Sequence, residues 1–203
     1  MNRLQSNITE SRRERERLKR HNDILEAAKA VFARDGYEKT SLEEIAARCE
    51  LAKGTIYYYF ENKEKLLNSV VESALDEIIQ NIVEAGRMEN TRASIKRLFE
   101  VILTLFKRDR DIFFIFFRER RKFESGVFSL ADKTIGGRFE TIIRKLGDIF
   151  RLGVERGEIK DYDPLILARI FVGLFHIIVL KSNMDPGNGA ELLTNILFDG
   201  VQK

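Results

Sequence analysis

The sequence is poor in the residues that break helices or that build covalent and metal scaffolds. Two prolines and 13 glycines among 203 residues leave few turn signals of the kind that punctuate β-sandwiches and barrels, which favours long helices. One cysteine excludes a disulfide framework within the chain, and two distant histidines argue against a metal site. We find no paired nucleophile and base and no phosphate-binding glycine loop, so we expect neither an enzyme nor a cofactor. The charged N-terminus is not typical of a secretory signal, which favours a cytoplasmic location.

Positive charge is concentrated at the start of a nearly neutral chain. The net charge is +3, yet residues 1–20 hold seven basic side chains against three acidic ones. We treat residues 1–17 as a basic N-terminal arm. Two interpretations stay open: a solvated helix start with alternating charge, or an arm that lies along a phosphate backbone.

Apolar residues recur at helical spacing along the chain, and no period-two pattern occurs, which predicts an all-α fold of about nine helices. The first helix ends at Gly36, in the position where a helix favours a left-handed residue. Thr40 to Glu43 fits a capping box that starts a short second helix, and Asn62 caps a long fourth helix. The other expected helices cover 53–59, 91–107, 109–122, 128–155, 163–181 and 190–201, with a loop over 183–189.

Two regions differ in composition. Four of the five tyrosines lie before residue 66, whereas 13 of the 15 phenylalanines follow it. We therefore expect a three-helix domain over 18–65 and a larger helical domain over 66–203; the resemblance described below implies DNA binding for the first and effector binding and dimerisation for the second.

The second and third predicted helices form a helix-turn-helix arrangement. Ile56 and Phe60 can face inward together, which leaves Lys53, Tyr57 and other polar side chains outward. A purely structural three-helix unit is the alternative, but it would not need tyrosines on its solvent face. Hydroxyl, lysine and helix N-terminal groups are the ones that contact phosphates and base edges.

Residues 20–67 resemble the TetR/AcrR-type bacterial transcriptional regulators. The resemblance rests on Thr40 to Ala46, on Lys53 to Phe60 and on Asn62 to Leu67. It implies that the third helix enters the major groove. Two departures are Ala52, where the family often has serine, and Tyr59, where many members have histidine. The positions that the resemblance assigns to DNA are Thr40, Ser41, Lys53, Gly54, Thr55, Tyr57, Tyr58, Tyr59 and Lys63, of which Tyr58 fits packing or backbone contact equally well.

The remainder of the chain matches the family only in layout, which implies a dimer and an effector pocket. The helix over 165–180 is apolar on nearly all faces but is short and charged for a membrane span. We expect a dimer seam with the last helix, through Phe171, Leu174, Ile178, Leu193 and Leu197.

A run of phenylalanines and isoleucines over 112–117 fits either dense core packing or the wall of an effector pocket. The second interpretation predicts an apolar cavity of about 300–1,000 Å³, with a neutral or anionic ligand slightly favoured by the arginines that follow. The lining would include Phe99, Phe106, Phe113, Phe117, Phe139 and His176, although His176 also suits a hydrogen-bonded core position.

The sequence thus predicts a nucleoid-associated, ligand-responsive DNA-binding regulator, a repressor released from a palindromic operator by a hydrophobic small molecule. Its partners would be double-stranded operator DNA, a second copy of the chain and that effector, with no membrane. The alternative is a constitutive DNA-binding or architectural protein without an effector. The residues do not separate a repressor from an activator.

Overall fold

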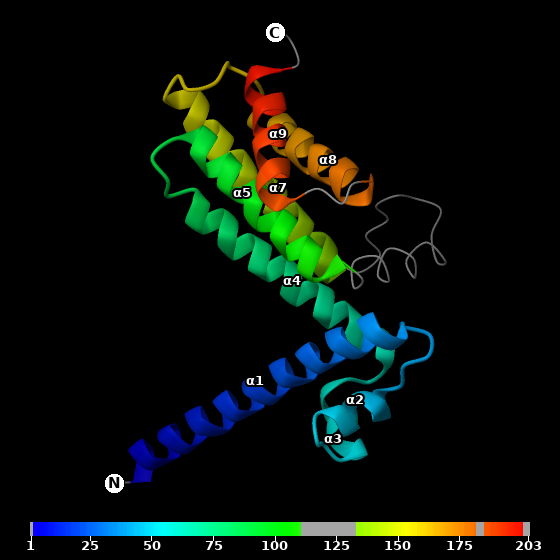
Figure 1. Cartoon of the computed structure of the whole chain (residues 1–203). Helices are drawn as coiled ribbons and strands as arrows, with labels where there is room; N and C mark the ends of the chain where they lie inside the picture. Colours follow the sequence, from blue (N-terminus) through cyan, green and yellow to red (C-terminus); the bar gives the residue numbers. More distant parts are fainter. Residues whose placement is uncertain (1, 111–132, 182–184, 201–203) are drawn as a thin grey trace. The chain divides into compact units, whose positions relative to one another are not determined.

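The computed structural model describes residues 2–110, 133–181 and 185–200, with side chains for 12–110, 134–175 and 185–200. Within these ranges the chain forms eight α-helices and no strand, as the periodicity predicts (Figure 1). Most of the helix expected over 109–122 lies outside the described residues. The chain divides into two compact units inside one helix, since the described residues up to Val71 belong to the first and those from Glu72 to the second.

The first unit is a three-helix head closed by the start of a fourth helix. It contains α1 (Asn2–Asp35), α2 (Leu42–Arg48), α3 (Lys53–Tyr59) and the first residues of α4 (Lys63–Ala85). Each helix turns its apolar stripe inward, because residues three and four apart share a face. The buried apolar side chains are Ile24, Leu25, Ala28, Val31, Phe32, Leu42, Ile45, Ala46, Ile56, Phe60, Leu66, Leu67, Val70 and Val71.

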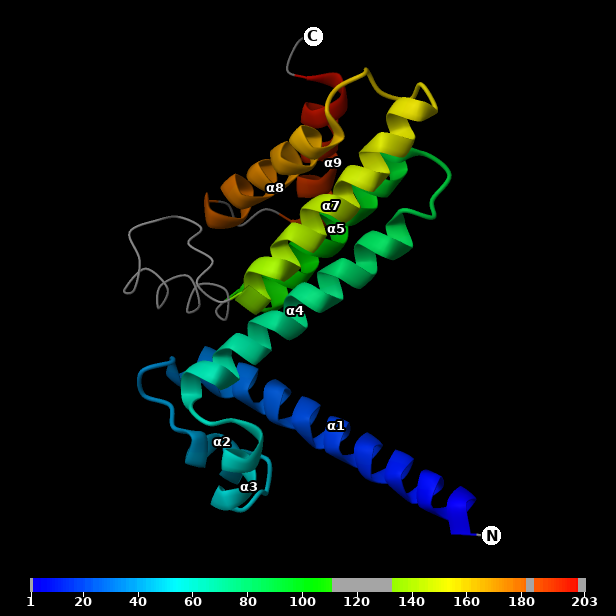
Figure 2. The same ribbon diagram turned by 180° about the vertical axis from the view of Figure 1, so that it is seen from behind.

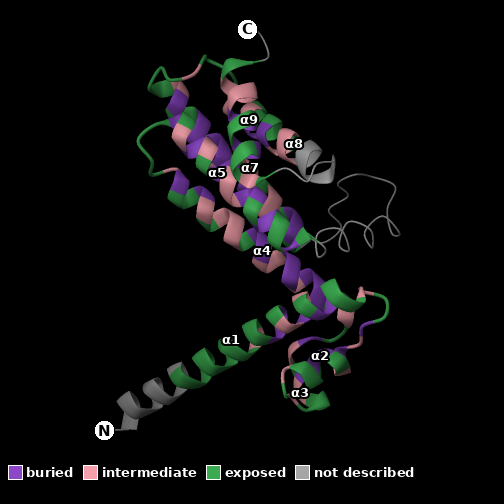
Figure 3. Cartoon of the chain, viewed as in Figure 1, coloured by how far each residue is buried: buried purple, intermediate pink, exposed green. Residues whose placement is uncertain are grey.

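The basic N-terminal arm is part of α1 in the structure. Residues 12–20 are helical and exposed throughout (Figure 3). Arg12 and Glu16 form an ion pair of 2.9 Å one turn apart, the pattern of a solvated helix with alternating charge. Whether this stretch also lies along DNA stays a prediction.

The helices of the first unit begin and end at capping residues. One of these caps lies one residue later in the chain than predicted. Gly36 ends α1 with φ of 80° and donates its N–H to the Phe32 carbonyl, as predicted. The expected capping box on Thr40 is wrong by one residue, because Ser41 caps α2 and exchanges hydrogen bonds with Glu44. Thr40 is instead buried, and its hydroxyl donates to the Gly36 carbonyl at 2.8 Å.

The second unit is a helical bundle. Besides the rest of α4 it holds α5 (Thr91–Arg108), α7 (Lys133–Glu155), α8 (Pro164–Lys181) and α9 (Pro186–Asp199). Figure 2 shows α7 lying along α8, and α5 packs against α9. A bidentate ion pair joins Arg92 of α5 to Asp199 of α9.

The last helix begins earlier than predicted. Asp185 caps α9 with its carboxylate, and Pro186 is the first helical residue, so the expected loop over 183–189 is wrong for its second half. The same Asp-Pro pair starts α8, where the predicted boundary is confirmed. The two glycines inside the first turn of α9 made that turn look like a loop.

Candidate nucleic-acid interface

The helices α2 and α3 are joined by a tight turn that fixes how α3 is presented. Glu50 in this turn adopts φ of 56°, a left-handed conformation that costs a residue with a β-carbon about 1–2 kcal/mol. The Leu51 N–H donates to the Ala46 carbonyl at 2.9 Å and closes the turn. Ile56 on α3 is fully buried and Phe60, which caps the end of α3, is 4% exposed, so one side of the helix packs against the core.

The opposite side of α3 carries polar and aromatic groups that face solvent. Tyr57 is 44% and Tyr58 is 75% exposed. Lys53 and Gly54 at the start of the helix are exposed as well. A β-carbon added to Gly54 would meet no atom within 4 Å, so its backbone is open to close approach from outside.

Tyr58 and Tyr59 lie in different settings. The Tyr58 ring points into solvent and meets Tyr59 edge-on at 5.3 Å between centroids. Tyr59 is half-buried beside His21 of α1, at 6.3 Å, and Thr55 is half-buried too. The N-terminus of α3 has no side-chain cap at Ala52, as expected from the missing serine, which leaves its first N–H groups without that partner.

Glu43 of α2 contacts two side chains of this surface, Lys53 and Tyr57. The sequence did not predict these contacts. Its carboxylate pairs with the Lys53 ammonium at 2.8 Å and accepts a hydrogen bond from the Tyr57 hydroxyl at 3.0 Å. The hydrogen bond from Lys53, with smaller help from backbone and Tyr57 donors, lowers the pKa of Glu43 to about 2. The same contact raises the pKa of Lys53 and of Tyr57. The sequence pattern predicts Glu43 in a capping box with Thr40, but the box lies on Ser41 and Glu44, so the Glu43 carboxylate is available to α3.

Lys63, the first residue of α4, is directed at the protein backbone. Its ammonium donates to the carbonyls of Tyr37 at 2.6 Å and Thr40 at 2.9 Å, with a longer contact to Glu38. It also lies 4.3 Å from the centre of the Tyr37 ring. These contacts fasten the start of α4 to the loop between α1 and α2.

The predicted effector residues of the second unit are only partly described. Phe99 is fully buried and stacks on Phe171 at 4.2 Å, while Phe106 is 8% exposed and meets Phe175 edge-on. Phe139 is half-buried. The side chains of Phe113, Phe117 and His176 lie outside the described residues.

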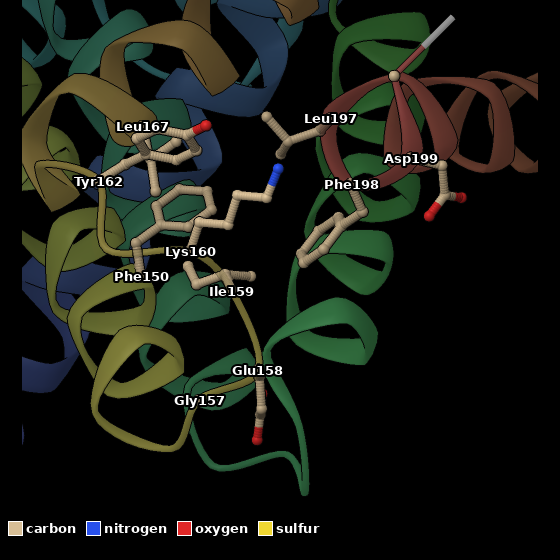
Figure 4. A pocket seen from close by; sticks show the side chains of 11 residues that line it. Phe150, Gly157, Glu158, Ile159, Lys160, Tyr162, Leu167, Leu197, Phe198 and Asp199 are labelled. Atoms are coloured by element: carbon tan, nitrogen blue, oxygen red, sulfur yellow. The ribbon is translucent and has the colours of Figure 1, made fainter. Parts of the chain in front are cut away.

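A surface cleft of about 650 Å³ lies elsewhere in the second unit (Figure 4). It is bordered by the segment between α7 and α8 and by the end of α9, and the three described residues of the predicted pocket, Phe99, Phe106 and Phe139, do not line it. Phe150, Tyr162 and Phe198 supply aromatic surface, and Lys160 reaches across the opening. Its acidic residues have partners: Glu158 accepts the Thr91 N–H at 2.6 Å, and Asp199 pairs with Arg92.

The residues predicted for a dimer seam divide into two groups. Phe171 and Leu193 are each 1% exposed and face their own core, so they offer no surface to a second copy. Leu174 and Leu197 are half-buried, and the side chain of Ile178 is not described. The exposed face of α8 instead presents Ile166 and Ile170, at 57% and 44% exposure, and Gly173, where an added β-carbon would meet nothing.

No group of three or more His, Cys, Asp or Glu side chains in the described ranges is arranged to hold a metal ion. None of the described helices combines the length and apolar character needed to span a bilayer.

Residues 24–70 match the family model of bacterial regulatory proteins, tetR family. The chain is 25% identical over 176 residues to YfiR of Bacillus subtilis, an uncharacterized HTH-type transcriptional regulator, with 77% of this chain and 76% of that protein covered. The transcriptional regulator FadR from Bacillus subtilis, in complex with stearoyl-CoA, shares the fold with a TM-score of 0.73 at 23% identity, covering 89% of this chain and 98% of that one. AibR in complex with isovaleryl coenzyme A and operator DNA gives a TM-score of 0.64 at 23% identity, over 88% and 98%.

Proposed function

Because the chain belongs to the TetR family of bacterial transcriptional regulators, we propose that it is a ligand-responsive repressor that binds a palindromic operator as a homodimer. The observation that carries the proposal is the outer face of α3. Lys53, Gly54, Tyr57 and Tyr58 are exposed on a short helix whose other side is locked into a buried core. A helix of this kind fits the major groove, and its hydroxyl and ammonium groups suit phosphates and base edges.

The residues of the proposed interface take different roles. Gly54 lets the backbone of α3 approach DNA, and Thr55, Tyr57 and Tyr58 reach bases or phosphates. Tyr59 packs beside His21 and supports the helix while its hydroxyl stays near the surface. Of the two hydroxyls before α2, the partly exposed Ser41 is the better phosphate contact, since that of Thr40 is buried.

We assign Lys63 an indirect role in DNA binding. Three backbone carbonyls already surround its ammonium, so it holds α4 against the loop that precedes α2. Because α4 continues beyond Val71 into the second unit, one unbroken helix can carry a change in that unit to the head.

The dimer would form through the exposed face of α8 together with α9. Ile166 and Ile170 lie one turn apart, and Gly173 lies one turn further on, where the absence of a side chain permits close helix packing. Leu192 of α9 is also exposed, at 42%. An apolar stripe on two neighbouring helices is what a four-helix seam about a two-fold axis requires.

The effector would be a hydrophobic small molecule bound in the second unit. The FadR and AibR structures hold acyl-CoA ligands, so acyl-CoA thioesters are the first compounds to test. Two places compete for the site: the phenylalanine cluster expected from the sequence, and the cleft beside Lys160. A ligand at 100 times its dissociation constant should stabilise the protein by about 2.7 kcal/mol.

The experiment for DNA binding is footprinting of the purified protein on the region upstream of its own gene. The proposal predicts a protected palindrome and an affinity that falls steeply as salt rises. No protected site would contradict it.

The experiment for the effector has two steps. Compounds are first screened for a rise in the melting temperature of the protein, and those that raise it are then tested for release of the protein from its operator. Phe139→Ala and Lys160→Ala separate the two candidate sites, because only the variant in the occupied site should weaken release. If no lipophilic compound shifts the melting temperature or releases DNA, the constitutive DNA-binder replaces the ligand-responsive repressor.

A further inference from the structure

Glu43 is an acidic residue that contacts α3 within the proposed DNA-reading surface. It lies in the first turn of α2 and contacts α3 through two different groups, the Lys53 ammonium at 2.8 Å and the Tyr57 hydroxyl at 3.0 Å. The Lys53 ammonium in turn lies 5.8 Å from the centre of the Tyr57 ring. The three side chains therefore form one connected group across the helix-turn-helix.

We propose that Glu43 is a positioning residue for operator recognition, which holds Lys53 and Tyr57 in the arrangement that reads the DNA. This inference rests on the proposed function of α3. Lys53 has an exposed side chain with four rotatable bonds and Tyr57 an exposed one with two, and ordering a flexible side chain on binding weakens affinity by about two- to tenfold. Glu43 lowers that penalty because it orders both side chains before DNA arrives.

The charge of Glu43 makes the proposal testable. A carboxylate beside DNA repels phosphates, so a role limited to charge would weaken binding to every sequence alike. A carboxylate that orients Lys53 and Tyr57 favours the correct sequence and, by pairing with Lys53, weakens non-specific attraction. Its pKa of about 2 keeps Glu43 ionised at any working pH.

The test compares binding to the operator and to a random duplex for Glu43→Ala and Glu43→Gln, with Glu61→Gln as the matched control. Glu61 lies two residues beyond the end of α3 and is exposed, so its variant removes the same charge from the first unit without disturbing these contacts. Glu61→Gln should raise affinity for both DNAs by one common factor. Glu43→Ala should raise affinity for the random duplex but lower the operator-to-random ratio about tenfold. Glu43→Gln keeps an oxygen that can accept from Tyr57 and should fall between.

Two further readouts separate positioning from a general loss of structure. In Glu43→Ala the Lys53 ammonium has lost its carboxylate partner and gains a phosphate contact. A plot of log affinity for DNA against log salt concentration should therefore be steeper by about 0.9 for this variant. Tyr57→Phe combined with Glu43→Ala should lower the ratio by less than the product of the single effects, because the two residues act as one unit. Circular dichroism checks that each variant is folded, and Glu43→Gln carries the test if Glu43→Ala is not.

The outcomes distinguish this inference from the function on which it rests. If Glu43→Ala raises the affinity for the operator and for the random duplex by the same factor, as Glu61→Gln does, then Glu43 acts only as a repelling charge. A wild-type protein without preference for any operator would instead overturn the proposed function itself.

Discussion

Removing the Lys63 side chain should loosen the head more than removing a neighbouring lysine does. Hydrogen bonds from a charged donor contribute about 1.5–3 kcal/mol each, and Lys63 donates two short ones, to Tyr37 and Thr40. Its half-buried setting reduces these values, because water can replace part of each contact. A lysine at the first residue of α4 also opposes the helix dipole by about 0.3–1 kcal/mol, which its removal relieves. We therefore expect Lys63→Ala to lower the free energy of unfolding by about 2 kcal/mol.

Urea unfolding followed by tyrosine fluorescence measures this loss in the head. The chain has no tryptophan, and four of its five tyrosines lie between residues 37 and 59. Lys65→Ala is the control, since it removes an exposed lysine from the same turn of α4. The salt dependence of DNA binding by Lys63→Ala should stay unchanged, whereas a direct phosphate contact would flatten its slope by about one. Equal stability of the two variants would refute the structural role of Lys63.

Three further predictions concern other parts of the chain. Glu50→Gly should raise the free energy of unfolding by about 0.5–1 kcal/mol, measured in urea, because glycine adopts the left-handed φ of 56° without steric cost. Ile170→Glu should convert a dimer to monomers in sedimentation, whereas Leu152→Glu, at a similarly exposed apolar position on α7, should not. Glu43→Gln should reduce the loss of folding stability at low pH, measured as the free energy of unfolding between pH 5 and pH 2. The pKa of Glu43 falls from its ordinary 4.5 to about 2, so its contribution is full above pH 4.5 and is lost as the pH drops toward 2.

Local signals were enough to predict most helices. The stripe of α1, its end at Gly36, the cap at Asn62 and the start of α8 at residues 163–164 depend on residues within four positions of one another, and the structure confirms them. The capping box on α2 failed because Thr40 to Glu43 and Ser41 to Glu44 both satisfy the same spacing. The structure selects Ser41, since Thr40 is needed inside to pair with the Gly36 carbonyl.

Contacts between distant residues could not be predicted from spacing. Glu43 meets Tyr57 across 14 positions, and Lys63 meets Tyr37 across 26. For a helix that is apolar on all sides, the side that faces inward also depends on contacts with distant parts of the chain. The sequence could not show that Phe171 is covered by Phe99 while Ile170 beside it stays exposed.

The central claim, that the outer face of α3 meets DNA, is tested most directly by operator binding of Gly54→Leu. A side chain at Gly54 meets no atom of the protein within 4 Å, so the variant should fold with unchanged or slightly higher stability. Gly137 on α7 is equally open, and Gly137→Leu serves as the control. We predict that Gly54→Leu loses operator affinity by at least about 100-fold, or about 2.7 kcal/mol, whereas Gly137→Leu keeps it. Full operator affinity in a folded Gly54→Leu protein would contradict the account.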